Sequence, residues 1–515
     1  KKIINTYLDK YGIYLKEYLP HNVIDKYNIP TLYYMYRYIH NPKSVKEYEL
    51  AYKRLKYEEF FDFELKLQYS RKENKKSFKR AKKWDVNVIR DFIKTIPFEL
   101  TDSQKEVVNE IYKDLKSNYP SNRLIEGDVG SGKTIVAALA IYAVALDNYE
   151  VCFMAPTEIL AYQHYQTLSN IFKDTPLKIE ILTSSIKGKK REELLNKIKS
   201  HEVDVIIGTH ALFTEDIIYD NLGLVITDEQ HRFGVKQRQA LREKGFNPDV
   251  LYLTATPIPR TLAISVFGDM DLSVIKTMPK GRKEIKTKVV LESNLDACLN
   301  FIKDELDKGN QAYVISPLIE ESKKLDLHDV FETSSMLENK FSNYSIKVLH
   351  GKMKQAEKDE IMTSFKNKEF QILVSTTVIE VGIDNPNATI MLIFNAERFG
   401  LSQLHQLRGR VGRGDKESYC FLVTNNSDVE RLKIIENTLD GFKLSEADLR
   451  LRGPGDFFGE RQSGLPNFKY GNLINDYYIL EDAKEDAYNI IFNDDISNYP
   501  ILYDKVLKEI NSIKD

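Results

Sequence analysis

The sequence predicts an α/β protein with two successive domains that each hold a parallel sheet, preceded by a helical segment and followed by a shorter C-terminal segment. The chain of 515 residues is long enough for three or four domains at about 100–200 residues each. From about residue 97, short runs rich in Val and Ile alternate with helical patterns, which is typical of parallel sheets covered by helices. The alternation pauses at residues 278–281 and then resumes. The expected divisions are residues 1–96, 97–281, 282–439 and 440–515.

The composition is that of an ordinary globular protein. Lys and Arg number 74 and Asp and Glu number 76, a formal net charge of −2, while 42% of the residues are hydrophobic and 29% are charged. These values exclude collagen, wholesale disorder and a disulfide-stapled mini-protein, and a net charge near zero still allows a local basic groove. The longest uncharged apolar run, residues 135–146, is shorter than the roughly 20 residues that cross a bilayer.

The cysteines and the first residues bear on the compartment. Cys152, Cys298 and Cys420 lie far apart and form no Cys-x-x-Cys pair, which argues against a zinc site and favours a reducing cytosol. The chain opens with Lys1 and no signal peptide follows, which suggests a fragment or a processed chain.

The first segment predicts a long amphipathic helix followed by a basic run. Within residues 46–65 the apolar side chains recur at helical spacing. These apolar positions are Leu50, Leu55, Phe60, Phe61 and Phe63. Residues 70–83 hold a cluster of Lys and Arg with a single acid, Glu73. The cluster has two interpretations, a solvated helix face or linker, which such runs usually are, and a stripe that contacts DNA phosphates.

The two central domains are expected to alternate strands and helices. The expected strands of the first are residues 124–125, 151–154, 179–182, 203–207, 224–226 and 251–253, with helices near 103–117, 133–147 and 158–172. The expected strands of the second are residues 288–291, 313–315, 346–349, 371–374, 390–394 and 420–423. No short-period repeat is present, and the last segment is rich in Gly and Arg to Gly464 before a plain helical tail.

The first chemical motif is a phosphate-binding loop. Residues 127–134 match the pattern G-x-x-x-x-G-K-[ST] in full, between an expected strand and an apolar helix, a context that a chance glycine-rich turn would lack. Glycines let backbone N–H groups close around phosphate oxygens, and the helix N-terminus adds a favourable partial charge. Lys133 is therefore expected to reach the β- and γ-phosphates, and the Thr134 hydroxyl to bind Mg²⁺.

The second motif is a pair of acids at the end of an expected strand. Asp228 and Glu229 follow the apolar run 224–227. Two neighbouring acids usually form a solvated turn, but after a phosphate loop in an α/β domain they are expected to serve catalysis. Asp228 would hold Mg²⁺ through water, and Glu229 would orient and deprotonate the attacking water.

The third motif is a cluster of arginines and glycines in the second domain. Arg408, Arg410 and Arg413 fall within six residues beside three glycines, which a solvated basic helix would not need. The better interpretation is that Arg410 and Arg413 approach the phosphate from the neighbouring domain and stabilise charge on the transferring phosphoryl group. A nucleotide held between two domains would convert its hydrolysis into domain motion.

These motifs together resemble the superfamily 2 helicases. Residues 98–104 resemble the adenine-reading element of that superfamily, residues 155–160 and 208–212 its DNA-contacting motifs, residues 228–231 its metal and base motif, and residues 254–257 its coupling element. Residues 349–353, 375–384 and 406–413 resemble the motifs of its second domain. The matches cover about residues 98–425 in the expected order.

Finer features are similar to the RecG family of branched-DNA translocases. These features are residues 231–235, residues 257–262 and a translocation motif over residues 440–464. Transcription–repair coupling translocases share that motif, but their acidic motif typically reads Asp-Glu-Glu-Gln, whereas residues 228–231 read Asp-Glu-Gln-His. Primosomal restart helicases carry clustered zinc cysteines, which this sequence lacks. Residues 40–42 and 51–60 resemble the segment that joins the family's wedge domain, an oligonucleotide-binding barrel, to the motor; the wedge itself would precede Lys1.

The resemblance implies two RecA-like domains and an ATP-driven translocase on double-stranded DNA that reverses stalled forks and remodels Holliday junctions. The implied catalytic residues are Lys133, Asp228, Glu229, Gln406, Arg410 and Arg413, with Thr134 and Asp228 on the metal. The implied nucleotide contacts are Phe98, Gln104, Gly127, Asp128, Val129, Gly130, Ser131, Gly132, Lys133, Thr134, Gly382 and Asp384. The implied DNA-contacting or coupling residues are Thr157, Thr209, His210, Thr254, Thr256, His350, Lys352, Arg450 and Arg452.

Some of the implied residues also have plain structural interpretations. Thr157, Thr209 and Lys352 belong to residue types that are common at loop ends. Arg450 and Arg452 precede Gly-Pro-Gly and are expected to form a turn that moves with the second domain, and the alternative is a structural turn with solvated arginines.

The implied cofactors are ATP and Mg²⁺. The implied partners are branched and double-stranded DNA and, further, single-stranded-DNA-binding protein, with no membrane, for a monomer in the bacterial cytoplasm at the nucleoid or, as an alternative, in an organelle of bacterial descent. Two other functions stay open. A transcription-coupled translocase would need a polymerase-binding module, which is not evident, and the acid pair argues against an ATP-gated DNA clamp that does not translocate.

Overall fold

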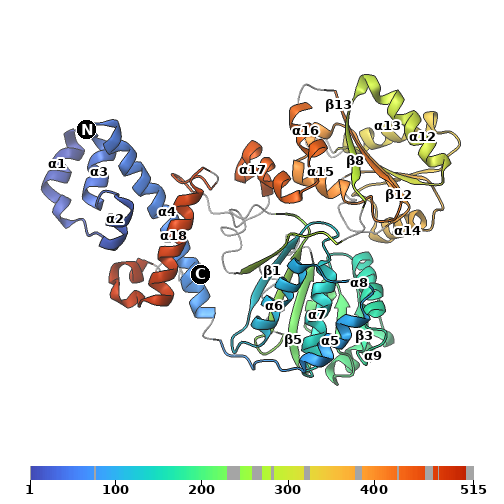
Figure 1. Ribbon diagram of the computed structural model, residues 1–515, viewed down its shortest axis with the longest axis horizontal. Coiled ribbons are helices and arrows are strands. Elements are labelled where there is room, and N and C mark those ends of the chain that lie inside the picture. Colours follow the sequence, from blue (N-terminus) through green and yellow to red (C-terminus); the bar gives the residue numbers. More distant parts are fainter. Residues whose placement is uncertain are drawn as a thin grey trace. The chain divides into compact units, whose positions relative to one another are not determined.

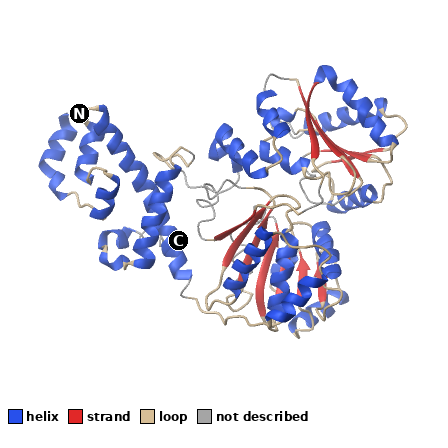
Figure 2. Cartoon of the chain, in the orientation of Figure 1, coloured by secondary structure: helices blue, strands red, loops and turns tan. Residues whose placement is uncertain are grey.

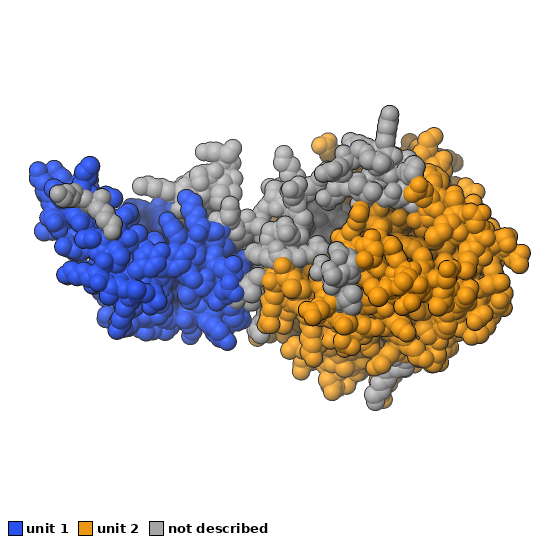
Figure 3. Space-filling view, turned by 90° about the horizontal axis from the view of Figure 1, so that it is seen from above, with its two compact units in different colours: residues 1–78, 259–271, 452–515 blue, residues 79–258, 272–451 orange. Residues whose placement is uncertain are grey.

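The structure is a computed structural model that describes residues 2–74, 77–228, 244–257, 270–279, 283–317, 325–376, 385–425, 429–458, 468–473 and 475–505. Three predicted site residues, Glu229, Gly382 and Asp384, lie outside the described residues, as do residues 231–235 and 459–464. The chain forms two compact units (Figure 3). Unit 1 comprises residues 1–78, 259–271 and 452–515, and unit 2 comprises residues 79–258 and 272–451.

Unit 2 contains two sheets, drawn as red arrows in Figure 2. The first sheet has the strand order β3-β4-β2-β5-β6-β1-β7, and the pairings from β3 through β1 are parallel. Its strands are β1 (Asn122–Gly127), β2 (Glu150–Met154), β3 (Ile179–Leu182), β4 (Val205–Gly208), β5 (Leu222–Asp228), β6 (Asp249–Thr254) and β7 (Asp271–Ile275). The helices of this part are α5 (Val86–Thr95), α6 (Asp102–Leu115), α7 (Lys133–Ala145), α8 (Glu158–Ile171) and α9 (Lys189–Lys199) (Figure 1).

The second sheet has the order β10-β11-β9-β12-β13-β8, with parallel pairing throughout. Its strands are β8 (Ile285–Leu291), β9 (Gln311–Ile315), β10 (Ile346–Leu349), β11 (Ile372–Ser375), β12 (Ala388–Ile393) and β13 (Ser418–Thr424). The helices that follow along this part of the chain are α12 (Leu295–Asp307), α13 (Leu325–Lys340), α14 (Gln355–Lys366), α15 (Leu401–Arg408), α16 (Val429–Asn437) and α17 (Gly441–Phe458).

Burial explains why these residues form sheets covered on both faces. Strands β2 and β6 are buried at every position, as expected for central parallel strands that contact helices on each side. Helix α7 is buried continuously from Ile135 to Val144, so it lacks the polar stripe of a surface helix and lies in the core. The Phe92 ring of α5 packs 4.3 Å from the ring of Tyr142 and 5.4 Å from that of Phe172, which closes the core on that side.

The predicted fold class is confirmed, and each of the twelve expected strands overlaps an observed strand. Strand β7 was missed. Its sequence mixes polar and apolar residues, and only Ser273 and Ile275 are buried. It lies at the edge of the first sheet, where a half-covered strand does not need a continuous apolar run.

Unit 1 joins the N-terminal helices to the C-terminal helix. Its helices are α1 (Lys2–Tyr11), α2 (His21–Tyr27), α3 (Leu32–His40), α4 (Val45–Asn74) and α18 (Tyr477–Tyr488), and α4 and α18 lie side by side (Figure 1). Asp486 of α18 accepts hydrogen bonds from the hydroxyls of Tyr27 at 2.7 Å and Tyr57 at 2.8 Å and pairs with Lys26 at 2.9 Å. The first and last segments, expected as separate pieces, therefore belong to one unit.

The amphipathic helix predicted over residues 46–65 is confirmed as the longer helix α4. Phe60 and Phe61 are fully buried, whereas the other three predicted apolar positions are half-buried. The same helix buries Arg54 completely, and the guanidinium pairs with the Glu17 carboxylate at 2.7 Å. A buried ion pair of this kind gives no apolar signal, so the sequence pattern described only part of the buried face.

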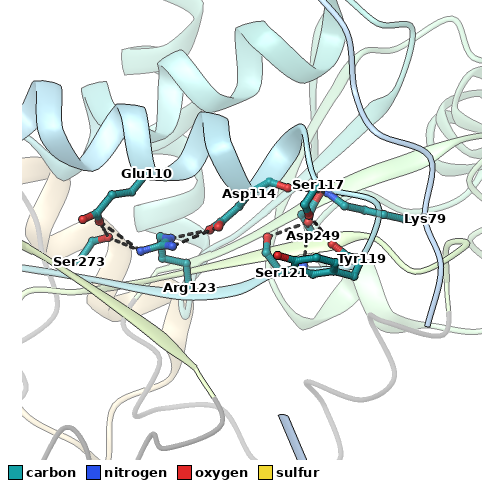
Figure 4. A network of polar contacts seen from close by, with 9 residues as sticks. All are labelled: Lys79, Glu110, Asp114, Ser117, Tyr119, Ser121, Arg123, Asp249 and Ser273. Carbon is teal, nitrogen blue, oxygen red and sulfur yellow. Dashed lines mark hydrogen bonds and ion pairs between the residues drawn. The ribbon is translucent and has the colours of Figure 1, made fainter. Parts of the chain in front are cut away.

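The basic run over residues 70–83 is not a solvated stripe throughout. Lys79 and Lys82 are 2% and 3% exposed, and their ammonium groups lie 2.5 Å and 2.7 Å from Asp249 Oδ2 (Figure 4 draws Lys79 and Asp249). The other carboxylate oxygen of Asp249 accepts from the backbone N–H of Ser121 at 2.9 Å and from its hydroxyl at 2.7 Å. The segment that carries them does link α4 to α5, but these two lysines are buried rather than solvated, and they fasten the chain to the start of β6.

Figure 4 shows this cluster together with a second group of polar contacts, centred on Arg123. Arg123 of β1 pairs with Asp114 at 2.5 Å and with Glu110 at 3.1 Å. Burial lowers the pKa of Lys79 below its ordinary value, although Asp249 acts in the opposite direction. The cost of burying these charges is offset by the contacts of the Asp249 carboxylate with two lysines and with Ser121.

We expect Asp249→Asn to destabilise the protein by about 3–5 kcal/mol, because it leaves two buried ammonium groups without their anion. Urea unfolding followed by circular dichroism measures the change. Asp91→Asn is the matched control, since Asp91 pairs with Lys94 on the surface with side chains 72% and 76% exposed, and it should cost less than about 1 kcal/mol. Equal costs for the two variants would contradict the assignment.

Candidate active site

The candidate site lies where three neighbouring strands of the first sheet end. In the register of β1, β6 and β5, Glu126 is opposite Thr254, and Leu253 is opposite Asp228. The phosphate loop follows β1, and Asp228 ends β5, two strands away, so about 10 Å separates the two strand ends. In parallel sheets ligands bind beyond the carboxyl ends of the strands, which is where these residues converge.

The phosphate loop has the backbone that its glycines predict. Gly130 and Gly132 have φ angles of +82° and +86°, a region that side chains other than hydrogen disfavour. Helix α7 begins at Lys133, directly after Gly132. The loop therefore leads directly into the N-terminus of α7, the end of a helix that favours an anion.

Lys133 lies against its own loop. Its ammonium group donates to the carbonyl oxygen of Gly127 at 2.7 Å and to that of Asp128 at 3.0 Å. The positive charge is thus held against the loop backbone, and its contact with phosphate stays a prediction.

Gln104 braces the loop from helix α6. Its side-chain oxygen accepts the N–H of Thr101 at 2.9 Å, which completes a capping box, and its amide donates to the carbonyl oxygen of Ser131 at 2.8 Å. A Cβ at Gly132 would lie 2.3 Å from that amide nitrogen. Gln104 is 1% exposed, whereas Phe98 is 52% exposed, so of the two predicted adenine contacts one is buried under the loop and the other lies at the surface.

Asp228 has a partner that sequence analysis missed. Its Oδ2 lies 2.8 Å from Nε2 of His164, whose ring packs 4.6 Å from that of Phe153. His164 is on α8, 64 residues before Asp228 in the chain. The sequence places a helix after residues 155–157 but carries no signal for this contact. The histidine fixes the direction of the carboxylate at the end of β5.

Thr134 and Asp228 offer one hydroxyl and one carboxylate to a cation. No group of three or more His, Cys, Asp or Glu that could hold a metal is found within the described part of the chain. Mg²⁺ usually keeps several waters and takes one or two carboxylates together with substrate phosphates. This sparse donor set therefore fits Mg²⁺ bound with a nucleotide.

The arginine motif lies beside the phosphate loop. A Cβ at Gly409, directly after α15, would lie 3.1 Å from the Cβ of Val129, so the backbone of Gly409 packs closely against the Val129 side chain. Gln406 of α15 donates a hydrogen bond to the hydroxyl of Thr256. Arg410 is buried, and Arg413 donates to the carbonyl oxygen of Gly409 at 3.3 Å. The second sheet thus supplies residues directly to the site on the first.

One further contact joins the two sheets, and sequence analysis missed it. His405 of α15 places Nε2 2.6 Å from Oδ1 of Asp128 in the phosphate loop. Burial raises the pKa of Asp128, but the hydrogen bonds from His405 and from the N–H of Val129 outweigh it, so the pKa lies below its ordinary value. Asp128 is therefore an ionised, buried carboxylate between the loop and α15.

The comparisons with known proteins agree with this architecture. Residues 101–264 match the family described as DEAD/DEAH box helicase, residues 293–415 the helicase conserved C-terminal domain, and residues 438–514 domain 3, C-terminal, of the ATP-dependent DNA helicase RecG. The ATP-dependent DNA helicase RecG of Bacillus subtilis (strain 168) is 48% identical across 99% of this chain and 76% of its own length. The chain belongs to the RecG family of ATP-dependent DNA helicases.

Two more relatives agree. RecG of Streptococcus pneumoniae serotype 4 is 49% identical over 94% of this chain and 73% of its own length. A structure of RecG bound to a three-way DNA junction is 42% identical and aligns with a TM-score of 0.76 over 91% of this chain. The present chain spans 62% of that solved chain, so these relatives are longer than the sequence described.

The coupling residues of this RecG-family chain have definite structural partners. The Thr157 hydroxyl caps α8 by accepting the N–H of Leu160 at 3.3 Å. The Thr254 hydroxyl accepts the N–H of Thr256 at 3.2 Å, and the Thr256 hydroxyl accepts a hydrogen bond from the Gln406 amide. These contacts account for threonine at the three positions without excluding DNA.

The remaining predicted DNA contacts differ in exposure. Thr209 is 2% exposed, whereas His210 and Lys352 are exposed. His350 is half-buried, its ring centroid lies 6.0 Å from that of Phe331, and burial followed by the charges of nearby lysines lowers its pKa. Of this set, His210 and Lys352 present the most surface to a DNA backbone.

Residues 441–458, the described part of the stretch that resembles the family's translocation motif, form helix α17. Arg450 is exposed on it, and the side chain of Arg452 lies outside the described ones. The turn expected at Gly453-Pro-Gly455 is wrong, because α17 continues as a helix to Phe458. A proline inside a helix removes one N–H donor and its ring clashes with the carbonyl four residues earlier, so the sequence favoured a turn that the structure does not form.

None of the described helices has both the length and the apolar content needed to span a membrane.

We expect Lys133→Ala to abolish ATP hydrolysis, with kcat reduced by at least about 10²–10³-fold, because the only lysine of the loop provides charge where phosphate binds. Release of inorganic phosphate measures the rate. Lys105→Ala is the control, since Lys105 forms an exposed pair with Asp102 on α6. Turnover retained by Lys133→Ala would refute the role of the loop.

Proposed function

We propose that this chain is the motor of an ATP-driven translocase that moves along double-stranded DNA and thereby remodels branched DNA such as stalled forks and Holliday junctions. The observation that supports it most directly is the contact of α15 with the phosphate loop, because it brings the two sheets together at the nucleotide site. The relatives named ATP-dependent DNA helicase RecG, and the RecG structure with a three-way junction, support the choice of substrate.

In this proposal each site residue has one task. The N–H groups of the phosphate loop and Lys133 bind the phosphates, and Thr134 and Asp228 hold Mg²⁺, which supplies a Lewis acid for the developing charge. His164 keeps the Asp228 carboxylate turned toward the site from β5. Arg410 and Arg413 stabilise negative charge on the transferring phosphoryl group.

Hydrolysis is coupled to motion through the seam between the sheets. Gln406 bonds to Thr256, which follows β6, so α15 is attached to the strand that lies between the phosphate loop and Asp228. A change in the phosphates that Lys133 and the arginines share changes the relative position of the two sheets. Exposed groups such as Lys352 and Arg450 then contact DNA phosphates, which carry no sequence information and allow movement over any sequence.

The finer parts of the proposal concern partners and place. We infer that Mg²⁺ is the metal, that the motor acts as a monomer on branched and double-stranded DNA, and that single-stranded-DNA-binding protein is a partner in a bacterial cytoplasm at the nucleoid. The relatives named above come from bacteria, which supports this place.

The deciding experiment is ATP hydrolysis measured without DNA, with linear duplex and with a forked duplex of equal length. We expect duplex DNA to raise kcat by about tenfold or more, because a translocase hydrolyses ATP when its track is bound. Stimulation by the fork above that by the linear duplex supports branch selectivity within this chain. A rate that ignores duplex DNA would remove the proposal.

We expect the double substitution Arg450→Ala and Arg452→Ala to uncouple hydrolysis from movement. The amount of third strand displaced from a DNA triplex per ATP hydrolysed should fall by about tenfold, because α17 loses the two arginines proposed to contact the DNA. Lys443→Ala, on the same helix with its side chain 74% exposed, is the matched control. An unchanged ratio in the double variant would exclude a coupling role for the two arginines.

A further inference from the structure

The contact between His405 and Asp128 has a defined proton. Nδ1 of His405 lies 2.9 Å from a guanidinium nitrogen of Arg408, and a guanidinium can only donate, so Nδ1 accepts. The ring proton is therefore on Nε2, which donates to Asp128 Oδ1 at 2.6 Å. Arg408 itself is 2% exposed and donates to the carbonyl oxygens of Ile435 at 2.7 Å and Thr438 at 2.9 Å, so its guanidinium is fixed by the second domain.

The partner of this proton belongs to the phosphate loop. The Oδ1 of Asp128 also accepts the N–H of Val129 at 2.6 Å, so the carboxylate is tied to the loop backbone. The carbonyl oxygen of the same Asp128 accepts from Lys133 at 3.0 Å. One residue thus contacts the phosphate-binding lysine through its backbone and the second domain through its side chain.

Helix α17 also packs tightly against the contact between His405 and Asp128. Gly441, the first residue of α17, is so close that a Cβ there would lie 2.6 Å from Nε2 of His405, 2.7 Å from Pro257 and 3.0 Å from Oδ2 of Asp128. Contacts under about 3 Å do not occur between such atoms, so any side chain at 441 would displace the histidine, the carboxylate or the proline.

Helix α17 is also fastened to both sides of this point. The hydroxyl of Ser445 donates to the carbonyl oxygen of Pro257 at 2.5 Å, just after the coupling residues of β6. Asp448 accepts the N–H of Ser402 at 3.1 Å, in the first turn of α15. The helix that carries Arg450 is therefore attached to the helix that carries His405 and to the segment that follows Thr256.

We propose that His405 is a positioning residue through which the phosphate loop controls α17: its Nε2 proton holds the Asp128 carboxylate, and Gly441 rests directly on that pair. When the phosphates draw Lys133 away from the carbonyl oxygen of Asp128, the loop shifts the carboxylate, and the histidine and α17 follow because no space separates them. This inference rests on the proposed function for its consequence, movement on DNA, but the proton position and the contact are independent of it.

The first test compares two substitutions of the histidine. Glutamine extends as far as Nε2 and carries an amide donor there, whereas asparagine places its amide near Nδ1 and is too short to reach Asp128. We expect His405→Asn to lower the DNA-stimulated kcat by about tenfold with KM for ATP changed less than about threefold, and His405→Gln to keep kcat within about threefold of the unaltered chain.

Equal rates for the asparagine and glutamine variants would overturn the proposal, since the donor at the Nε2 position would then be irrelevant. A rise in KM without a fall in kcat would overturn it as well, because the histidine would then only support nucleotide binding. Thermal unfolding of both variants checks that each is folded.

The second test inserts a methyl group beside the histidine. We expect Gly441→Ala to reproduce the loss of His405→Asn, and the two changes combined to lose no more than either alone, because both break one contact. Lys443→Ala, two residues away with an exposed side chain, is the matched control. Additive losses from Gly441→Ala and His405→Asn would show that the glycine and the histidine act separately, against the proposal.

The third test does not depend on activity. In the chain labelled with ¹⁵N-histidine, the imidazole signals that disappear in His405→Gln belong to His405, and their shifts report which nitrogen holds the proton. We expect the proton on Nε2; a proton on Nδ1, or one on each nitrogen, would overturn the proposal. If the unaltered chain shows no stimulation by duplex DNA, the proposed function fails while this measurement still decides the contact.

Discussion

The arrangement of the motor depends on one constraint: the phosphate loop of the first sheet is touched from the second. The close approach of Gly409 to Val129 and the hydrogen bond from His405 to Asp128 meet this constraint at adjacent loop residues. Each contact is specific in a different way, since the first leaves little space for a side chain at Gly409 and the second uses a carboxylate. Without these two contacts each sheet would hold half of the site, and hydrolysis at the first sheet would not change the position of the second.

Much of the fold and the nucleotide loop could be predicted because their signals are local. Each expected strand was a short apolar run, and a buried parallel strand needs little else. The loop at 127–134 was predicted for the same reason, since its glycines and lysine are contiguous and its backbone angles follow from them. The residues that were missed, His164 and His405, contact partners 64 and 277 residues away in the sequence. A single sequence contains nothing that pairs a lone histidine with a distant acid.

The basic run illustrates how charge is misjudged when the partner is distant. Local composition indicated a solvated face or a DNA contact, but Lys79 and Lys82 are buried around Asp249, which is 170 residues from the first of them. The helix that passes Gly453-Pro-Gly455 is a second case, because the expected turn followed from propensity alone. For the two lysines the local rule was sound and the tertiary surroundings decided the outcome.

Two buried carboxylates, Asp249 and Asp128, illustrate the difference between a permanent contact and a contact that can rearrange. Asp249 is surrounded by two ammonium groups and a serine, and removing the carboxylate would leave two ammonium groups in the interior, so that cluster is suited to fixing the chain permanently. Asp128 is held across the seam by a hydrogen bond from His405, an interaction to a charged group of about 1.5–3 kcal/mol. A bond of that size is within reach of a change in phosphate contacts at the neighbouring lysine. The seam is therefore strong enough to align the two sheets and weak enough for the nucleotide to rearrange it, which a buried ion pair in the same place would prevent.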